Sequence, residues 1–484
     1  MASVRGQGTE PGVGREIQQA LKRSHLVGSV RTLIVGIVAL ATAFAFLFVG
    51  AVRPGAAPPP RTRPAATPSV TSAAMAPPTS STVQAPVAAP VPHVNLTAAG
   101  PSSVGRSFTY GYDLATAISG SLSAPTVQGA LQMAQSIPGG FVDVPIMGWG
   151  QANPEISPGI FNFASLARQL AFVQASGSTP VITLCGAPDW MKGGLPGTTD
   201  WSQIATAPLP QHFQDFAALS AAVARAFPQV KYFAVWNELK GFWNPTTRVT
   251  DIAGYTAMYN DTYQAIKAVR PDALVGGPYV SLHSLSGPAP RWAPAPSGPW
   301  GHLEAGQLSD IAYWLANKVG ADFIAVDGRS FTNDAGLTTD PVSSTAKYAA
   351  VDQWLATQTP LPIVWMESHV LPDPTLYNLQ QQAAVRVAAL LEMASSGAST
   401  GMQWDPEQST TWDEGLWTPA WLPGGGQPTP LGLELPAVLG VLAAPVTLAT
   451  GTPPGTLVAT GAAGTVTVTY TATSGSVVVT GPGH

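Results

Sequence analysis

Two glutamates about 130 residues apart each end an apolar run typical of a buried strand. Glu238 closes the run Phe233-Ala234-Val235-Trp236-Asn237-Glu238, and Glu367 closes Pro362-Ile363-Val364-Trp365-Met366-Glu367. Cleavage of a glycosidic bond needs two carboxyl groups, one to protonate the leaving oxygen and one to attack or stabilise the sugar cation. If both runs are parallel barrel strands, their carboxyl ends converge on one substrate. The spacing therefore predicts a catalytic pair, with Glu238 as general acid/base and Glu367 as nucleophile.

The neighbours of Glu238 suggest how it would work. The Asn237 amide can bond a sugar hydroxyl beside the reacting carbon. A general acid needs a pKa raised toward neutrality, and we expect Trp236, Phe242 and Trp243 to provide an apolar wall that raises it. The alternative is a surface glutamate at a strand-to-loop junction next to Lys240. Recurrence of the pattern at Glu367 favours the catalytic interpretation.

Strand-like and helix-like segments alternate from Ser107 onward. Eight strands with following helices predict a (β/α)8 TIM barrel. The open doubly wound sheet is the alternative, but the Gly-rich phosphate loop that it needs after the first strand is absent from the sequence. The eighth helix is expected at Leu431–Leu442. The predicted strands are Phe108–Tyr112, Phe141–Met147, Pro180–Cys185, Tyr232–Trp236, Ala273–Gly276, Phe323–Val326, Leu361–Met366 and Thr400–Trp404.

Aromatic residues follow several of these strands. Trp190 comes after the third strand and Trp404 ends the eighth. Sugar rings stack their C–H faces on such side chains, so we expect both residues, together with Trp236, to line a substrate site. For each of them, ordinary packing is the competing interpretation.

The N-terminal hundred residues have a different composition. Residues 32–52 carry no charge and form an apolar segment that is long enough to span a bilayer as a helix. We expect a cytoplasmic tail over 1–31, a signal anchor over 32–52 and a Pro/Ala/Ser/Thr-rich linker over 53–100 that cannot bury enough surface to fold. Basic residues precede the anchor, which places the following domain outside the cytoplasm. A signal peptide cleaved after Val49 and Ala51 is the alternative, and would give a secreted protein.

The remaining chain is predicted to form two parts, a barrel over 101–446 and a small accessory β-sheet over 447–484. Three Val/Thr-rich strands are expected at Thr456–Thr460, Thr465–Thr471 and Ser476–Thr480. Three strands alone are marginally stable, so the sheet should pack on the barrel or recruit a strand such as Val91–Leu96.

Composition excludes several classes of function. Charged residues are 10 % of the chain, the net charge is −5, and basic runs are confined to the N-terminal tail, so nucleic acid is not an expected partner. The single cysteine, Cys185, allows no intrachain disulfide, and we expect it to be a buried, inert thiol. The seven histidines show no metal-binding spacing, and we expect neither a metal nor a cofactor.

These residues resemble the retaining glycoside hydrolases of clan A, most closely family 39, which includes β-xylosidases, α-L-iduronidases and exopolysaccharide hydrolases. The likeness rests on Trp236-Asn237-Glu238, on the stretch from Tyr255 to Pro278 and on Ile363-Val364-Trp365-Met366-Glu367, and covers roughly Phe108 to Leu442. It implies an acid/base at Glu238 and a nucleophile at Glu367. Met366 stands where the family usually has Thr or a similar residue.

The sequence departs from the family in two strands, and both departures bear on which sugar the enzyme would bind. Many relatives end the sixth strand with a His or Tyr that touches the nucleophile, whereas this sequence has Asp327, with His283 or His369 as possible substitutes. The second strand contains Asp143 and lacks the Arg of many clan members. The resemblance implies a retaining glycosidase, and the expected signal anchor places it on the membrane, outside the cytoplasm. Its expected substrate is an oligo- or polysaccharide of the cell envelope or environment. A catalytically silent carbohydrate-binding barrel and a transglycosylase are the alternatives.

Overall fold

The computed structural model describes residues 108–114, 118, 121–408 and 414–481. The expected tail, anchor and linker (1–31, 32–52 and 53–100) and the possible added strand Val91–Leu96 lie outside these ranges. Within them, no helix combines the length and apolar character that crossing a bilayer requires.

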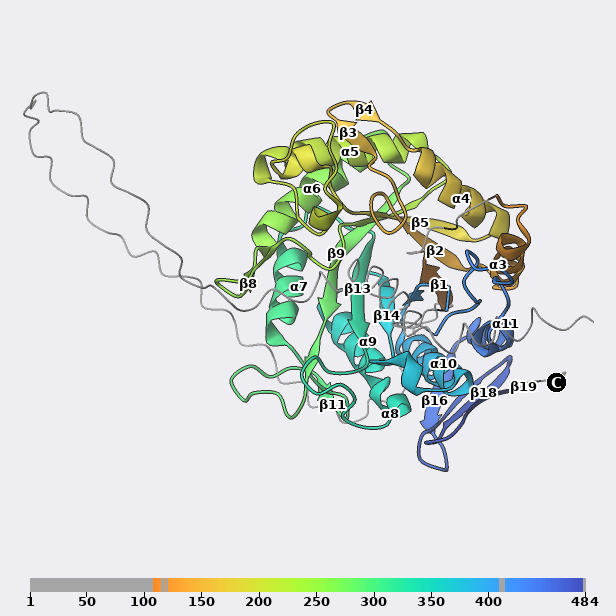
Figure 1. The fold of residues 1–484 in the computed structure, drawn as a ribbon. Helices are drawn as coiled ribbons and strands as arrows, with labels where there is room; N and C mark the ends of the chain where they lie inside the picture. The colour runs from red at the N-terminus through yellow and green to blue at the C-terminus, as the bar shows by residue number, and fades with distance from the viewer. Residues whose placement is uncertain (1–107, 115–117, 119–120, 409–413, 482–484) are drawn as a thin grey trace, which may run out of the picture. The chain divides into compact units, whose positions relative to one another are not determined.

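Eight parallel strands close into a barrel, as predicted (Figure 1). Each strand pairs with its neighbours in the chain, and the last strand pairs with the first. The barrel strands are β1 (Thr109–Asp113), β2 (Phe141–Pro145), β5 (Thr179–Leu184), β6 (Tyr232–Val235), β9 (Leu274–Leu282), β13 (Phe323–Arg329), β14 (Ile363–His369) and β15 (Thr400–Trp404).

A helix follows every barrel strand and covers the outside of the barrel (Figure 1). The helices start and end where their sequences direct. Asp251 caps α6 by accepting a hydrogen bond from the Gly254 N–H (2.9 Å), and a capping box of Asn378 and Gln381 begins α10. They are α3 (Pro125–Gln135), α4 (Ala164–Ser176), α5 (Phe213–Ala226), α6 (Ile252–Val269), α7 (Ala305–Asn317), α9 (Ala346–Gln358), preceded by the short α8 (Pro341–Ser344), α10 (Leu379–Ser396) and α11 (Pro430–Leu442).

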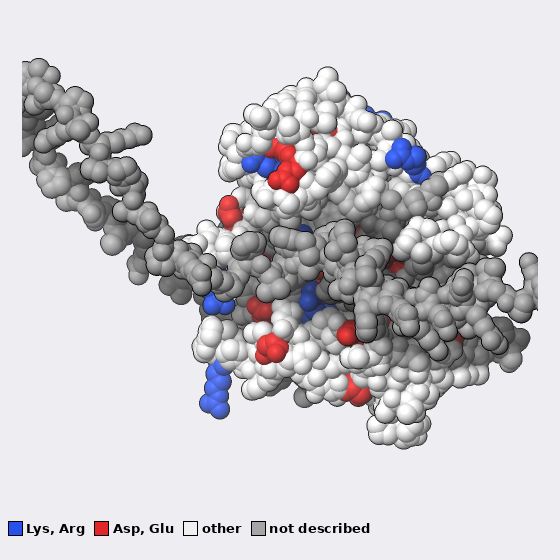
Figure 2. Space-filling model, in the orientation of Figure 1, with Lys and Arg blue, Asp and Glu red and all other residues white. Residues whose placement is uncertain are grey.

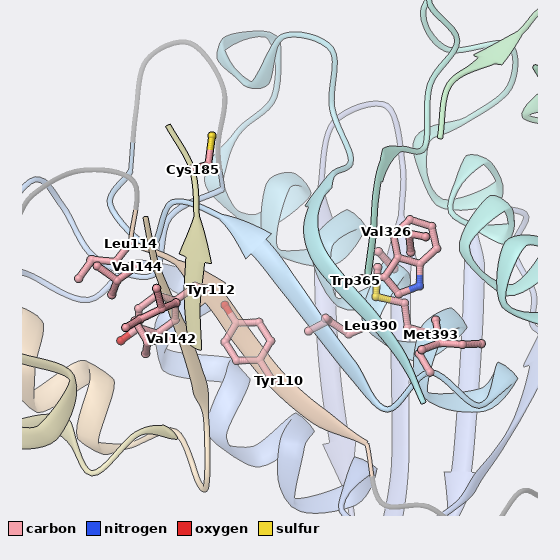
Figure 3. Packing of buried hydrophobic residues seen from close by; sticks show 14 of the residues in the cluster. Tyr110, Tyr112, Leu114, Val142, Val144, Cys185, Val326, Trp365, Leu390 and Met393 are labelled. Carbon is pink, nitrogen blue, oxygen red and sulfur yellow. The ribbon is translucent and has the colours of Figure 1, made fainter. Parts of the chain in front are cut away.

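Two apolar layers hold this arrangement together. Inside the barrel, Val181, Ala234, Ala325 and Met402 form the middle of the strand core. Outside it, aliphatic and aromatic side chains of the strands pack against the helices, as Figure 3 shows for Trp365 beside Leu390 and Met393. Cys185 is fully buried, and burial raises the pKa of its thiol to about 12, which confirms an inert cysteine.

The C-terminal segment forms an antiparallel sheet, as predicted, but with four strands. They are β16 (Val446–Thr450), β17 (Thr456–Gly461), β18 (Gly464–Tyr470) and β19 (Gly475–Thr480). The fourth strand, β16, directly follows α11, so the sheet begins one residue before the expected boundary. It packs on α10, where the Gln381 side chain donates to the Thr471 carbonyl (2.9 Å).

Charged side chains are sparse on the face of the molecule drawn in Figure 2. This agrees with the 10 % charged composition. The described part of the chain buries many of its acids instead, and one of them, Asp352, anchors the strand that carries Glu367. Its carboxylate accepts hydrogen bonds from the Trp365 indole on β14 (2.8 Å) and the Ser396 hydroxyl on α10 (2.6 Å).

Burial raises the pKa of Asp352 to about 7. In the unfolded chain an aspartate loses its proton near pH 4, so between about pH 4 and pH 7 the folded protein keeps a proton that the unfolded chain has lost. Stability therefore falls as pH rises through this window. We predict that the free energy of unfolding of Asp352→Asn, relative to the wild type, increases from pH 4 to pH 7 by at most about 1.4 kcal/mol per pH unit.

Chemical unfolding at several pH values measures the difference in the free energy of unfolding between Asp352→Asn and the wild type. Asp272→Asn is the control, because exposed Asp272 pairs with Arg270 and its pKa is lowered to about 2. That variant should show no such increase, and a pH-independent difference for Asp352→Asn would contradict the prediction.

Candidate active site

A layer of acids closes the carboxyl end of the barrel interior. Side chains alternate along a strand, so Asp327, two residues after the inward Ala325, also points inward. Asp327 pairs with Glu367 across β13 and β14, and Asp113 pairs with Asp143 across β1 and β2. All four are buried, with exposures of 4 % or less. The barrel thus brings together carboxyl groups from four strands.

Glu367 is held by two donors. One carboxylate oxygen, Oε1, accepts hydrogen bonds from the Asn237 amide (2.8 Å) and the Tyr279 hydroxyl (2.6 Å). The other, Oε2, lies 3.7 Å from His369 Nε2. Hydrogen bonds from fixed donors orient a carboxylate and stabilise its charge. Glu367 therefore has one oxygen, Oε1, that is fixed by two hydrogen bonds and one oxygen, Oε2, that faces His369.

Tyr279 was missed by the sequence analysis. The predicted fifth strand ended at Gly276, just before Gly277 and Pro278, residue types that are typical of turns. In the structure β9 continues to Leu282 and contains a bulge, since Pro278 and Val280 pair with consecutive residues of β13 and Tyr279 is the extra residue. Its φ of 54° is rare for a bulky residue. The bulge directs the Tyr279 hydroxyl to Glu367.

Glu238 lies in a loop with unusual backbone geometry directly after β6. Trp236, Glu238 and Leu239 all have positive φ angles, of 68°, 49° and 54°. Such conformations cost free energy and cluster at functional sites. They place the Glu238 carboxylate in a salt bridge with Lys240, whose ammonium also donates to Asn237 Oδ1 (2.6 Å). Lys240 Nζ lies 5.1 Å from the centre of the Trp149 ring.

The expectation that the pKa of Glu238 is raised is wrong. Burial does raise it, but the charge of Lys240 and a hydrogen bond with Asp327 outweigh burial, so the pKa lies well below its usual range. The expected apolar wall is also absent in the form proposed. Trp236 is buried between Phe216 and Phe242, and Trp243 is 52 % exposed.

The pKa of Asp327 is shifted in the opposite direction to that of Glu238. Burial raises its pKa well above the usual range, and the charges of Glu238 and Glu367 raise it further. A neutral Asp327 can donate the hydrogen bond that it shares with the ionised Glu238. Asp327 is thus hydrogen-bonded to Glu238 and is the strand partner of Glu367. Asn237 bonds both Glu367 and Lys240, the salt-bridge partner of Glu238.

Asp143, on the strand that lacks the arginine of many clan members, forms part of a second acid pair with Asp113. It accepts a hydrogen bond from Thr183 (2.6 Å), and burial raises its pKa to about 7. Burial also raises the pKa of Asp113, and the charges of Asp143 and Glu367 contribute. Proximity of like charges in a buried layer favours protonation of some of its members.

The remaining predicted substrate residues occupy different environments. Trp190 is buried, donates from its indole to the Glu155 carbonyl (3.0 Å) and packs on His212. The Trp236 indole donates to the Lys240 carbonyl. Trp404 is half-buried with its ring centre 6.2 Å from that of His369. His283 lies 3.1 Å from the Ser281 hydroxyl, and burial lowers its pKa to about 4.

One group of side chains in this site could hold a cation. Single ligand atoms of Asp327, Glu367 and His369 lie within 4.8 Å of one another. Motif spacing could not reveal this set, because two members are alternate residues of β14 and the third comes from β13.

A separate cavity between α3 and α11, lined by residues such as Met133 and Leu433, has no titratable side chain in its lining.

Comparison with known proteins supports the fold. No protein-family model and no curated protein matches the sequence. Among solved structures, a monomeric β-xylosidase from Caulobacter crescentus CB15 has a TM-score of 0.50 and 18 % identity over 77 % of this chain and 75 % of that chain. A GH39 enzyme from Xanthomonas axonopodis pv. citri follows at a TM-score of 0.48 and 17 % identity, over 78 % of this chain and 75 % of that chain. At such identities the likeness is one of fold, and this chain shares the barrel of the β-xylosidase.

We predict that Tyr279→Phe lowers the free energy of unfolding by about 1.5–3 kcal/mol, because it removes a hydrogen bond to a charged group. Tyr112→Phe is the matched control, since the Tyr112 hydroxyl is buried without a hydrogen-bond partner. Its removal should cost nothing or stabilise the fold. Equal losses in the two variants, measured by chemical denaturation, would argue against a Tyr279–Glu367 bond.

Proposed function

We propose that this protein is a retaining glycoside hydrolase with Glu367 as nucleophile and Glu238 as acid/base. The observation that carries the proposal is the hydrogen-bond network at the carboxyl end of a closed barrel, where Asn237 bonds Glu367 and also Lys240, the salt-bridge partner of Glu238. Most glycosidases that retain configuration use such a pair of carboxyl groups. The shared fold with a β-xylosidase is consistent with this function.

In the proposed reaction, Glu367 attacks the anomeric carbon through Oε2 while its other oxygen stays bonded to Asn237 and Tyr279. The glycosidic C–O bond breaks, and Glu238 gives a proton to the leaving oxygen. Water then attacks the glycosyl-enzyme, Glu238 accepts the proton from it, and Glu367 is released. The hydrogen bond between Asp327 and Glu238 provides a path by which Glu238 can take up its proton. A sugar in place of the water would make the protein a transglycosylase.

A second candidate, a catalytically silent carbohydrate-binding barrel, is favoured by one observation. Lys240 holds Glu238 ionised, whereas a general acid must carry a proton when the leaving group departs. Turnover of any glycoside distinguishes the two functions. Saccharide binding without turnover in a screen of aryl glycosides and envelope polysaccharides would favour the silent barrel.

The roles of the two glutamates can be separated by chemical rescue. Glu367→Ala should abolish turnover, because no glycosyl-enzyme forms. Glu238→Ala should lose about 10²–10⁴-fold on substrates with poor leaving groups and much less on those with good ones. Azide needs no base, so it should restore turnover of Glu238→Ala and yield a glycosyl azide of retained configuration.

Product analysis by NMR checks this outcome, with Glu304→Ala as a control outside the site. Rescue of Glu367→Ala with inverted product, and none for Glu238→Ala, would mean that the two roles are exchanged.

We also propose that the enzyme is tethered to the membrane by residues 32–52, with the barrel outside the cytoplasm and a polysaccharide of the envelope or surroundings as substrate. The support is the uncharged apolar segment and the linker that follows it. The full chain should remain with membranes after an alkaline wash, while a chain that starts at Pro101 should be soluble and folded. Release of the full chain as a shortened soluble form would indicate a cleaved signal peptide instead.

A further inference from the structure

The geometry points to a divalent-cation site formed by Asp327, Glu367 and His369, with Zn²⁺ as the ion that suits it best. The site shares Glu367 with the proposed catalytic pair and adds the Asp327 carboxyl group of β13 and the His369 imidazole of β14.

Strand geometry brings the three ligands together. Asp327 and Glu367 are direct partners across β13 and β14. His369 is two residues beyond Glu367, so it projects from the same face of β14. One ligand atom from each residue lies within 4.8 Å of the others, and His369 Nε2 is 3.7 Å from Glu367 Oε2. Zn²⁺ bonds of about 2.0–2.2 Å in a tetrahedron separate ligand atoms by roughly 3.4 Å, so small side-chain shifts would complete the site.

A second observation points to a ligand. Asp327 is 1 % exposed, and its Oδ1 has no hydrogen-bond partner. A buried carboxyl oxygen without a partner is costly, and a cation that displaces the proton of Asp327 would satisfy it.

The surroundings of Glu367 suit a metal ligand as well. Its Oε1 is occupied by Asn237 and Tyr279, while Oε2 faces His369. Metal-binding carboxylates are typically hydrogen-bonded in this way on their far side, which fixes their orientation.

The ligand types select the ion. Mg²⁺ and Ca²⁺ prefer oxygen ligands alone, so an imidazole nitrogen argues against them. Zn²⁺ takes histidine and carboxylate ligands together, and three protein ligands leave its fourth position open for water.

Binding would have a consequence for the proposed reaction, and this consequence rests on the proposed function. An ion on Glu367 Oε2 occupies the oxygen that would attack the sugar. Zn²⁺ should therefore inhibit hydrolysis, and a chelator should reverse the inhibition.

Calorimetric titration of the chelator-treated full-length chain with ZnCl₂ tests the site without any substrate, so its outcome is independent of whether the protein hydrolyses glycosides. We expect one Zn²⁺ per chain at this site and no comparable heat with MgCl₂. His369→Gln should weaken binding at least about tenfold, since even residues behind metal ligands contribute 10–100-fold. His212→Gln makes the same chemical change away from the site and should bind as the wild type does.

Equal Zn²⁺ affinity in the wild type and His369→Gln would overturn the inference, as would the lack of stoichiometric binding in the wild type. Circular dichroism establishes that the variants are folded. If His369→Gln does not fold, Co²⁺ added to the wild type provides the test. A visible spectrum of four-coordinate cobalt that Zn²⁺ abolishes supports the site, and a spectrum of the hydrated ion alone overturns it.

Discussion

The ammonium of Lys240 balances negative charge at a barrel end crowded with carboxyl groups. It pairs with Glu238 and bonds Asn237, whose amide in turn bonds Glu367. The same arrangement leaves a proton on Asp327 and keeps Glu238 ionised. Removal of one partner from a buried charged network leaves the others uncompensated, which is strongly destabilising. The positions of both glutamates therefore depend on this cation.

Much of the fold follows from sequence periodicity. The eight strands, the helix at 430–442 and the C-terminal sheet appear where alternating and helical patterns predict them. The two glutamates could be identified because each follows a continuous apolar run, the pattern of a strand buried on both faces. Parallel pairing then requires that the ends of such strands meet, although Glu238 and Glu367 lie far apart in sequence.

Other parts of the site could not be predicted, because they depend on spatial neighbours. The bulge that directs Tyr279 to Glu367 lies beyond a Gly-Gly-Pro sequence that is typical of a strand end. The pKa of Glu238 depends on where the flexible Lys240 side chain points, and the aromatic residues nearby suggested the opposite shift. Trp190 and Trp236 resemble sugar-stacking residues in sequence, yet their indoles are buried and bond backbone carbonyls.

The central claim is that Glu367 forms a covalent bond with the sugar. Incubation with a panel of activated 2-deoxy-2-fluoro glycosides should trap this intermediate, because fluorine slows its hydrolysis more than its formation. Peptide mapping by mass spectrometry should then find the added sugar mass on Glu367. A label on Glu238 or Asp327, or glycoside turnover with inverted product and no label, would contradict the account.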